Sequence, residues 1–434
     1  MFAPASLLLP AGEVVTVATF NAEWLGYPTN SDNWNGSRST QIEAVAAEIL
    51  ALEADIVALQ EVIVDPVNGN ALQDLVDELN AVDPLGMWEG DYNPKFSIWW
   101  NPDFEAYPAQ RQAYVWRSAT VRFLSSEVML DQVIDAGDRL FASGRLPFLL
   151  RVEAGPVGFR REVQLINLHL KCCRTYDDRR AESMIFLLDE LYSQYAEVSL
   201  IVLGDFNVAD RGGAYGEISE WGFYDDDDGD GAPDFAHAAG AVADLNWDDI
   251  DHIMVSNELL PYWERLPVEQ RNGITSSFVS DHPIVYTRLD FSPPSVAEQY
   301  EAWIQTYLDI EPAIAAMSAF EDDYDRDDLA NGLEFMTGTS PIRMDAGLLT
   351  IEPGTAGSLR LNYRQRKGLP ASSLSLSTST SLGNPSSWSR MVPDESSLTV
   401  ADDDDPAIER VSVQIRNPST PEPVMFRLEA VLEP

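Results

Sequence analysis

One stretch in the middle of the chain constrains the fold most. Residues 200–203 form an apolar run of strand length, and Gly204, Asp205 and Asn207 follow it. Because Asp205 and Asn207 are two residues apart, both side chains can point the same way off the end of a strand. A carboxylate and an amide placed there can bind a metal ion and a phosphate, although glycine with Asp and Asn is also common in ordinary turns. The other strand ends decide between these interpretations.

Two earlier apolar runs end in polar side chains in the same way. Residues 14–20 lead to Asn21, and residues 55–60 lead to Glu61. Both runs have the length and the β-branched content of buried strands. Apolar residues at helical spacing follow each run, and a capping box that opens at Thr40 predicts the start of the first helix. This alternation predicts an α/β fold with polar side chains gathered at strand ends.

The second half of the predicted domain continues the pattern. Short aromatic segments predict an antiparallel section, after which a strand over residues 162–169 places Asn167 and His169 on one face. A later strand over residues 249–255 carries Asp251. The last strand opens at Ser280-Asp281-His282-Pro283 and runs through Leu289.

Histidine usage strengthens the pattern. The chain has only four histidines, and three of them, His169, His252 and His282, lie at or next to strand ends that carry acids or amides. Because His252 alternates away from Asp251 along its strand, we interpret His252 as a structural, hydrogen-bonded residue. For the other polar residues at these strand ends, coincidence is therefore a weaker explanation than a shared functional site.

In these pieces the chain resembles the endonuclease/exonuclease/phosphatase family, which includes deoxyribonuclease I. The resemblance covers about residues 13 to 290 and implies a four-layer α/β sandwich with the site at one edge of two packed sheets. It also implies hydrolysis of a phosphate ester with a divalent cation, Mg²⁺ or Mn²⁺. The matching pieces run in the family's order: Thr19-Phe20-Asn21, Leu59-Gln60-Glu61, Asn167-Leu168-His169, Gly204-Asp205-Phe206-Asn207, Ile250-Asp251-His252 and Ser280-Asp281-His282-Pro283.

The resemblance and the side-chain chemistry together imply a role for each matching residue. The metal ligands are expected to be Glu61, Asn21 and Asp281, whose oxygens suit magnesium. His282, oriented by Asp251, is expected to be the general acid/base. The remaining expected roles are water activation by Asp205, hydrogen bonds to phosphoryl oxygens from Asn207 and His169, and substrate binding by Asn167, Arg174 and Arg179.

Three features near these motifs leave alternatives open. In deoxyribonuclease-like members a carboxylate supports the equivalent of His169, whereas the nearest positions here are expected to be Gln110 and Gln112. The basic residues after His169, among them Lys171, Arg174, Arg179 and Arg180, either hold substrate phosphates or form a solvated helix start. Cys172 and Cys173 form either a vicinal disulfide or two thiols, and Trp99-Trp100 form either core or a stacking surface.

The C-terminal part has a different composition. We expect the catalytic domain to span residues 13–291, a linker, helix and calcium loop residues 292–345, and a small β-sandwich domain residues 346–434. Acidic and amide side chains match the ligand spacing of a calcium loop, although Asp328 stands where glycine is usual and a solvated acidic turn is the alternative. The expected ligands are Asp323, Asp325, Asp327, Asn331 and Glu334. This part resembles the tails of secreted bacterial proteins. A second acidic loop, Asp225 to Asp234, is interpreted as solvated.

The charge of the chain limits how it can bind a substrate. The 28 basic and 71 acidic residues give a formal net charge of −43, which argues against diffuse affinity for nucleic acid. A polyanionic substrate must therefore be held locally, by a metal ion and clustered arginines. The excess itself is best explained by adaptation of the surface to a salty medium. No run reaches membrane-spanning length, and no signal peptide is visible.

These observations favour a secreted, extracellular or periplasmic, metal-dependent phosphodiesterase that acts as a nuclease on DNA or RNA. Two alternatives use the same residues: a phosphatase and a phospholipid phosphodiesterase. A non-enzymatic binding module is the third alternative, but it would not need the complete set of acids. The sequence indicates no protein partner.

Overall fold

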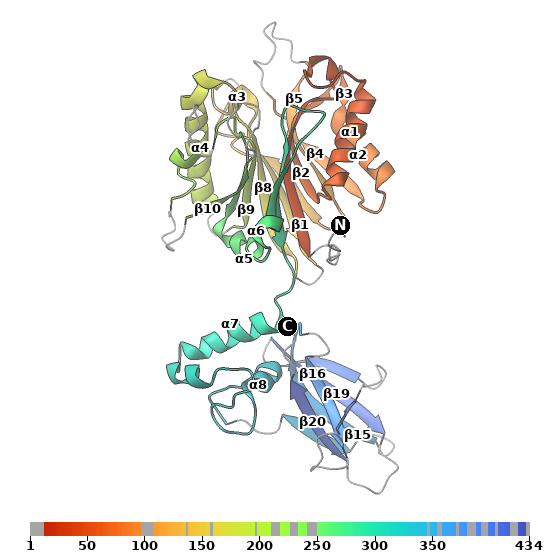
Figure 1. Cartoon of the computed structure of the whole chain (residues 1–434), viewed down its shortest axis with the longest axis vertical. Coiled ribbons are helices and arrows are strands. Elements are labelled where there is room, and N and C mark those ends of the chain that lie inside the picture. The colour runs from red at the N-terminus through yellow and green to blue at the C-terminus, as the bar shows by residue number, and fades with distance from the viewer. Residues whose placement is uncertain are drawn as a thin grey trace, which may run out of the picture. The chain divides into compact units, whose positions relative to one another are not determined.

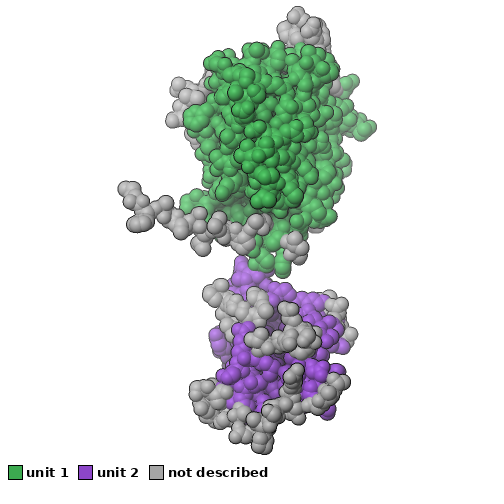
Figure 2. Space-filling view, turned by 90° about the vertical axis from the view of Figure 1, so that its right-hand side faces the viewer, with its two compact units in different colours: residues 1–293 green, residues 294–434 purple. Residues whose placement is uncertain are grey.

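The structure is a computed structural model with two compact units, residues 1–293 and residues 294–434 (Figure 2). It describes residues 13–96, 107–135, 138–156, 159–195, 198–209, 218–225, 233–240, 250–344, 348–353, 358–369, 373–379, 388–391, 398–403, 407–416 and 424–430. Among these residues, no helix is long and apolar enough to cross a membrane.

The first unit contains two mixed sheets that pack face to face (Figure 1). In the first sheet the order is β12-β13-β1-β2-β5-β4, with β3 paired to β2. Strands β1 and β2 are parallel, whereas β13 and β5 run antiparallel to them. The strands are β1 (Val14–Leu25), β2 (Ile56–Asp65), β3 (Gly69–Asn70), β4 (Trp88–Tyr92), β5 (Gln110–Arg117), β12 (Asn272–Thr275) and β13 (Ile284–Asp290).

The second sheet is also mixed, with a parallel pair of strands at its centre. Its order is β10-β11-β9-β8-β7-β6, in which β8 and β9 are parallel and β11 is antiparallel to β9. The strands are β6 (Arg122–Val128), β7 (Phe148–Ala154), β8 (Arg161–His169), β9 (Leu200–Asp205), β10 (Phe235–Gly240) and β11 (Asp251–Ser256).

Helices cover the outer face of each sheet. Helices α1 (Arg38–Ala51) and α2 (Ala71–Val82) pack on the first sheet, and α4 (Asp177–Gln194) packs on the second (Figure 1). Shorter helices are α3 (Phe141–Gly144), α5 (Leu260–Trp263) and α6 (Val268–Arg271). The four-layer α/β sandwich is therefore confirmed. Helix α1 begins earlier than expected, because the N-cap is Ser37, whose side chain accepts a hydrogen bond from the Thr40 amide; the prediction of a capping box at Thr40 was wrong.

Apolar side chains on both faces of the central strands explain this layering. In β1, Val17 points into the core between the two sheets, and its neighbour Ala18 points into the core beneath α1 and α2. In β9, Leu203 and Val202 divide in the same way between the inter-sheet core and the core beneath α4. A strand buried on both faces reads as a continuous apolar run. This is why the runs stood out in the sequence.

Strand direction places the predicted residues at one edge. Parallel strands β1, β2, β8 and β9 end at the same edge at which the antiparallel strands β11 and β13 begin. In the second sheet, Asp205 is in register with His169 on one side and with Asp251 on the other. The topology therefore brings the ends of the parallel strands and the starts of β11 and β13 to one edge of the two sheets.

The second unit combines helices with small sheets. Helix α7 (Val296–Leu308) begins with a capping box at Ser295, and α8 (Asn331–Thr337) packs Phe335 against Tyr300 of α7. The all-β C-terminal part is confirmed: its sheets have the orders β14-β15-β19-β18 and β17-β16-β20. The strands are β14 (Leu349–Pro353), β15 (Ser358–Arg366), β16 (Leu374–Ser379), β17 (Ser389–Met391), β18 (Leu398–Asp402), β19 (Ile408–Arg416) and β20 (Met425–Ala430).

Candidate active site

The amide of Asn21 joins residues from both sheets. Asn21 lies near the edge in β1 and is buried. Its Nδ2 atom donates a hydrogen bond to Oδ2 of Asp205 at 3.1 Å and lies 3.4 Å from Oε1 of Glu61. The same atom lies 3.4 Å from Nε2 of His282. Three other predicted residues that are distant in sequence, Glu61, Asp205 and His282, therefore meet around the side chain of Asn21.

Irregular pairing aims Glu61 into this space. The register of β2 against β5 shifts between Leu59 and Val62, and Glu61 itself has a φ of 61°. Such a bulge re-aims a side chain within a strand; β2 continues past Glu61 to Asp65, so the strand does not end at Glu61 as expected. Oε2 of Glu61 accepts hydrogen bonds from the Trp24 amide and from Nε2 of Gln110. Burial is the main cause that raises the pKa of Glu61.

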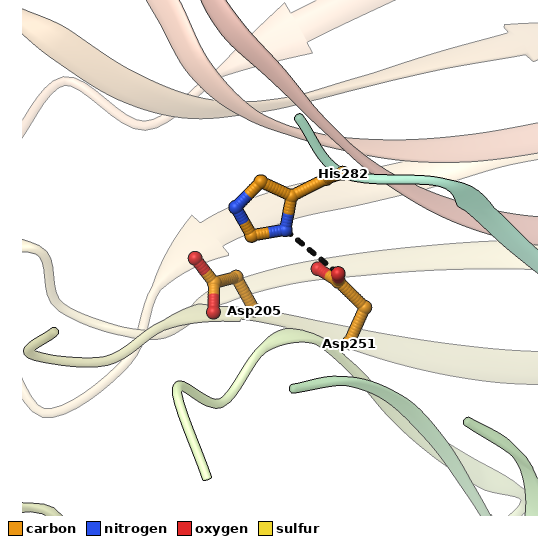
Figure 3. A group of neighbouring side chains, drawn as sticks. All are labelled: Asp205, Asp251 and His282. Atoms are coloured by element: carbon orange, nitrogen blue, oxygen red, sulfur yellow. Dashed lines mark hydrogen bonds and ion pairs between the residues drawn. The ribbon is translucent and has the colours of Figure 1, made fainter. Parts of the chain in front are cut away.

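A carboxylate holds His282 in place (Figure 3). Nδ1 of His282 lies 2.7 Å from Oδ2 of Asp251, which is buried at the start of β11. Burial alone would lower the pKa of His282, but the charge of Asp251 and this hydrogen bond raise it well above its usual value. The ring therefore carries a proton on Nδ1 and directs Nε2 towards the site.

Asp205 lies beside this pair, with its carboxylate next to the His282 ring (Figure 3). Burial and the nearby charges of Asp251 and Glu61 raise the pKa of Asp205 to about 7, against the opposing effect of His282. Asn207, two residues on, has a φ of 56° and donates its amide N–H to Oδ1 of Asp205 at 2.9 Å. Its side-chain Nδ2 donates to the Leu170 carbonyl at 3.2 Å.

The structure adds Arg145, which sequence reasoning missed. Nη1 of Arg145 lies 2.9 Å from Nδ1 and 2.6 Å from Nε2 of His169, and Nη2 donates to the Leu170 carbonyl at 3.4 Å. Burial and the charge of Arg145 lower the pKa of His169 well below its usual value, so that His169 is neutral. Arg145 follows α3, in a segment with no helix or strand periodicity, and no sequence signal identified it.

The predicted glutamines near His169 have other partners. Gln110 contacts Glu61, as described, and Nε2 of Gln112 donates to the Asn167 carbonyl at 2.9 Å. A guanidinium therefore contacts His169 at the position where a carboxylate was sought. Carboxylates also lie close to this ring: Nε2 of His169 is 3.5 Å from Oδ2 of Asp205 and 3.8 Å from Oε1 of Glu61.

The edge also offers donors for a divalent cation. Ligand atoms of Asp205, Asp251 and His282 lie within 4.8 Å of one another. Oδ1 of Asp251 is buried and has no hydrogen-bond partner among the described residues. Asp281 is 59 % exposed, and its Oδ1 lies 3.9 Å from Nε2 of His282. Carboxylate oxygens fit a hard divalent ion. Asn21 turns its Nδ2 donor to Glu61 and Asp205, so only its Oδ1 atom, which accepts from the Glu23 amide, could bind such an ion.

The other predicted substrate-binding residues are dispersed. Asn167 is buried between the sheets: its Nδ2 donates to the carbonyls of Leu59 and Ala113, both at 3.0 Å, and its Oδ1 accepts from Gln60 at 2.7 Å. These bonds hold the sheets together and turn the side chain away from the site. Arg179 lies in the first turn of α4. The side chain of Arg174 is outside the described residues.

The structure also shows the surroundings of His252 and of the two cysteines. His252 is buried, lies edge-on to Phe206, and its Nε2 lies 2.7 Å from the Val208 carbonyl. Cys172 and Cys173 are both free, with their Sγ atoms 2.7 Å apart. Trp99-Trp100 and residues 226–232 of the acidic loop lie outside the described residues.

The predicted calcium loop lies in the second unit. The carboxylates of Asp323, Asp325 and Asp327 have ligand atoms within 4.8 Å of one another. Asp328, at the position where glycine is usual, has a φ of 71° and so adopts the left-handed backbone that glycine would provide. Asn331 and Glu334 are buried on α8, and Nδ2 of Asn331 donates to the carbonyls of Met317 and Ala319.

Several solved structures are similar to part of this chain. The human Nocturnin catalytic domain with bound sulfate is 19 % identical over 64 % of this chain and 93 % of that one, with a TM-score of 0.40. Truncated TDP2 of Caenorhabditis elegans is 17 % identical over 64 % and 98 %, with a TM-score of 0.40. An endonuclease/exonuclease/phosphatase from Bacteroides vulgatus is 17 % identical over 64 % and 98 %, with a TM-score of 0.42.

The search of curated proteins gives no match. The sequence profile of the Endonuclease/Exonuclease/phosphatase family matches residues 18–282, which is more than half of the chain. The matched range contains Asn21, Glu61, His169, Asp205, Asp251 and His282. The chain belongs to the endonuclease/exonuclease/phosphatase family and is a hydrolase of phosphate ester bonds.

Proposed function

We propose that this hydrolase is a phosphodiesterase that cleaves nucleic acid, with a divalent cation, Mg²⁺ or Mn²⁺, bound by Glu61, Asn21 and Asp281. One observation carries the proposal: the paired Asp251 and His282 face Asp205 and Asn21 across the edge at which the two sheets meet. A proton-exchanging histidine, a carboxylate for water and an amide stand within one small space. This combination supports hydrolysis by direct attack of water.

In the proposed reaction, the oxygen of a water molecule attacks phosphorus, and the ester P–O bond on the opposite side breaks. Asp205 orients the water and accepts its proton. His282, held by Asp251, faces the reacting phosphate and supplies a proton to the leaving oxygen. No covalent intermediate with the protein forms.

Charge that develops on the phosphoryl oxygens is stabilised by donors beside Asp205, whose Oδ2 atom lies 3.5 Å from Nε2 of His169. Neutral His169 and cationic Arg145 lie together there, with Asn207 close to the same loop through Leu170. Hydrogen-bond donors that are fixed before the reaction stabilise such charge at little reorganisation cost. A bound divalent cation supplies Lewis-acid stabilisation of the same oxygens.

A substrate panel tests the proposal. Plasmid DNA, RNA, bis(p-nitrophenyl) phosphate, p-nitrophenyl phosphate and sphingomyelin are each incubated with magnesium and with a chelator. Chelator-sensitive cleavage of nucleic acid and of the diester is expected. Activity confined to the monoester or to sphingomyelin would show that nucleic acid is not the substrate. Absence of activity of the folded protein on every substrate would contradict hydrolysis itself. Action outside the cytoplasm remains a prediction from the sequence.

A further inference from the structure

Three cations that form no ion pair with a described carboxylate adjoin the active site. Arg145, Lys171 and Arg179 form no ion pair with any described carboxylate, and Nε atoms of both arginines are buried without a hydrogen-bond partner among the described residues. This is unexpected in a chain with 71 acidic and 28 basic residues. Other arginines of the first unit do form ion pairs, among them Arg38–Asp74, Arg122–Glu153, Arg139–Glu182 and Arg151–Glu162.

The three cations lie close to one another. Lys171 and Arg179 both lie beside the ring of Tyr176, and Arg145 donates to the carbonyl of Leu170, the residue before Lys171. Burial is the main cause that lowers the pKa of Arg145; Glu61 and Asp205 oppose it, and repulsion from Arg179 adds to it. Like charges held together and partly out of water destabilise the protein unless an anion joins them. Glu61 and Asp205 offset the charge of Arg145. No described carboxylate forms an ion pair with Lys171 or Arg179, so an anion at these two cations is expected to come from the substrate.

An unusual backbone segment fixes this arrangement. Phe141, Ala142, Ser143 and Gly144 have consecutive φ values of 42°, 52°, 59° and 132°. Oγ of Ser143 accepts a hydrogen bond from Nη2 of Arg179 at 2.6 Å. Arg145, two residues after Ser143 in the chain, contacts the ring of His169. A strained segment of this kind persists only where its surroundings hold it, and such segments cluster at functional sites.

An aromatic ring lies between two of the cations. Tyr176 is 39 % exposed. Nζ of Lys171 lies 5.1 Å from the centroid of its ring, and Cζ of Arg179 lies 6.0 Å from it. Exposed aromatic rings beside a basic groove stack nucleobases, while the cations hold the phosphates.

We propose that Arg179, Lys171 and Tyr176 form a subsite for a second phosphate group of the substrate, next to the phosphate at His169 and Arg145. Arg179 and Lys171 bind the phosphate, and Tyr176 supports the nucleoside between the two phosphates. This inference rests on the proposed function and makes it more specific. The preferred substrate is then a chain with at least two phosphates, instead of an isolated diester.

The experiment compares two dinucleotides, TpT and its 5′-phosphorylated form pTpT. In the wild-type protein, the second phosphate is expected to raise kcat/KM by roughly 10-fold or more, the effect of a charge-assisted hydrogen bond. In Arg179→Gln the ratio of the two kcat/KM values should fall towards one. Arg179→Lys, which keeps the charge and can be better tolerated by the fold, should keep part of the gain. Arg151→Gln, a paired surface arginine, is the matched control and should keep the wild-type ratio.

Binding is measured separately from catalysis. With His282→Ala, calorimetric titration in magnesium buffer should show tighter binding of pTpT than of TpT, and adding Arg179→Gln should remove the difference. Equal affinities for the two ligands would overturn the subsite even if hydrolysis is fast. Absence of hydrolysis by the wild-type protein would instead overturn the proposed function, while the binding preference could still be measured.

Discussion

Oδ2 of Asp251 accepts a hydrogen bond from Nδ1 of His282 over 2.7 Å, and this carboxylate is almost fully buried. Asp251→Asn keeps the shape of the side chain but removes the charge that orients the ring and raises its pKa. We expect kcat to fall by roughly 100-fold or more, the usual contribution of a positioned acid or base. Steady-state hydrolysis of bis(p-nitrophenyl) phosphate measures this effect. The control is Asp74→Asn, which changes an exposed carboxylate paired with Arg38; equal activity of both variants would remove His282 from the mechanism.

The contact between Arg145 and His169 gives a second prediction. Arg145→Gln should reduce kcat by about 10-fold or more, because a charge-assisted contact to the phosphate is lost. It should also raise the pKa of His169 towards its ordinary value, since both burial and the charge of Arg145 lower that pKa. Titration of the imidazole signals by NMR checks the second effect. Arg145→Lys should preserve more activity than Arg145→Gln; an unchanged His169 titration in Arg145→Gln would show that the two side chains do not interact.

Gly204 is expected to tolerate no side chain. Its φ is 141°, and a Cβ atom would lie 2.1 Å from the carbonyl oxygen of Leu168. Because the contacting atoms belong to the backbone of a paired strand, they cannot move without shifting His169 or Asp205. Gly204→Ala should lower the free energy of unfolding by about 2 kcal/mol or more, measured by urea denaturation. The control is Gly222→Ala, where the nearest atom is a side-chain oxygen of Asp225 at 3.4 Å. A variant Gly204→Ala with wild-type stability would contradict the close approach of the two strands.

Asp65 makes stability depend on pH. Although burial alone would raise its pKa, hydrogen bonds from Asn68, Ala109 and Val67 lower it below its ordinary value. A carboxyl group with a depressed folded-state pKa stabilises the protein above its unfolded pKa of about 3.9, and this contribution is lost as the pH falls through the lower value. Asp65→Asn should be less stable at pH 7 by about 1–2 kcal/mol, since several donors lose an acceptor.

Thermal unfolding between pH 7 and pH 3 measures this dependence. The difference between wild-type protein and Asp65→Asn should narrow as the pH falls, because protonation removes the advantage of the wild-type carboxylate. A constant difference across this range would exclude Asp65 as the source.

The acidic loop of the second unit gives a prediction for metal binding. If Asp323, Asp325 and Asp327 bind calcium, added calcium should raise the melting temperature of the full chain. At a free calcium concentration of 100 times the Kd, the expected stabilisation is about 2.7 kcal/mol. Asp325→Asn should remove most of this shift while leaving hydrolysis in magnesium intact. Scanning calorimetry with calcium, magnesium and chelator separates the two ions, and an equal response of the wild-type protein and Asp325→Asn would identify the loop as a solvated turn.

Residues on regular elements could be predicted, because strand ends carry a periodic signal. Asn21, Glu61, Asp205 and Asp251 end or begin apolar runs, and the antiparallel or parallel direction of each run brings them to one edge. The same logic failed for Asn167: alternation gives the face of a strand, but it does not tell whether that face meets substrate or the second sheet.

Arg145 could not be predicted for a different reason. It is placed by four successive residues with positive φ, only one of which is glycine, and propensity carries no signal for such a conformation in Phe, Ala or Ser. The missed helix start at Ser37 is a smaller error of the same kind. Two capping patterns overlap there, and only the backbone conformation decides which residue is the cap.

The contact between Asn21 and His282 spans 261 positions of the chain. Its two partners stand almost at opposite ends of the first unit, so synthesis must nearly complete this unit before they can meet. A ribosome-bound or proteolytically shortened chain that ends before Ser280 therefore holds Glu61, Asp205 and Asp251 but lacks His282 and has no working centre. Hydrolysis of phosphate esters is therefore expected to begin only after the segment that carries His282 has been synthesised.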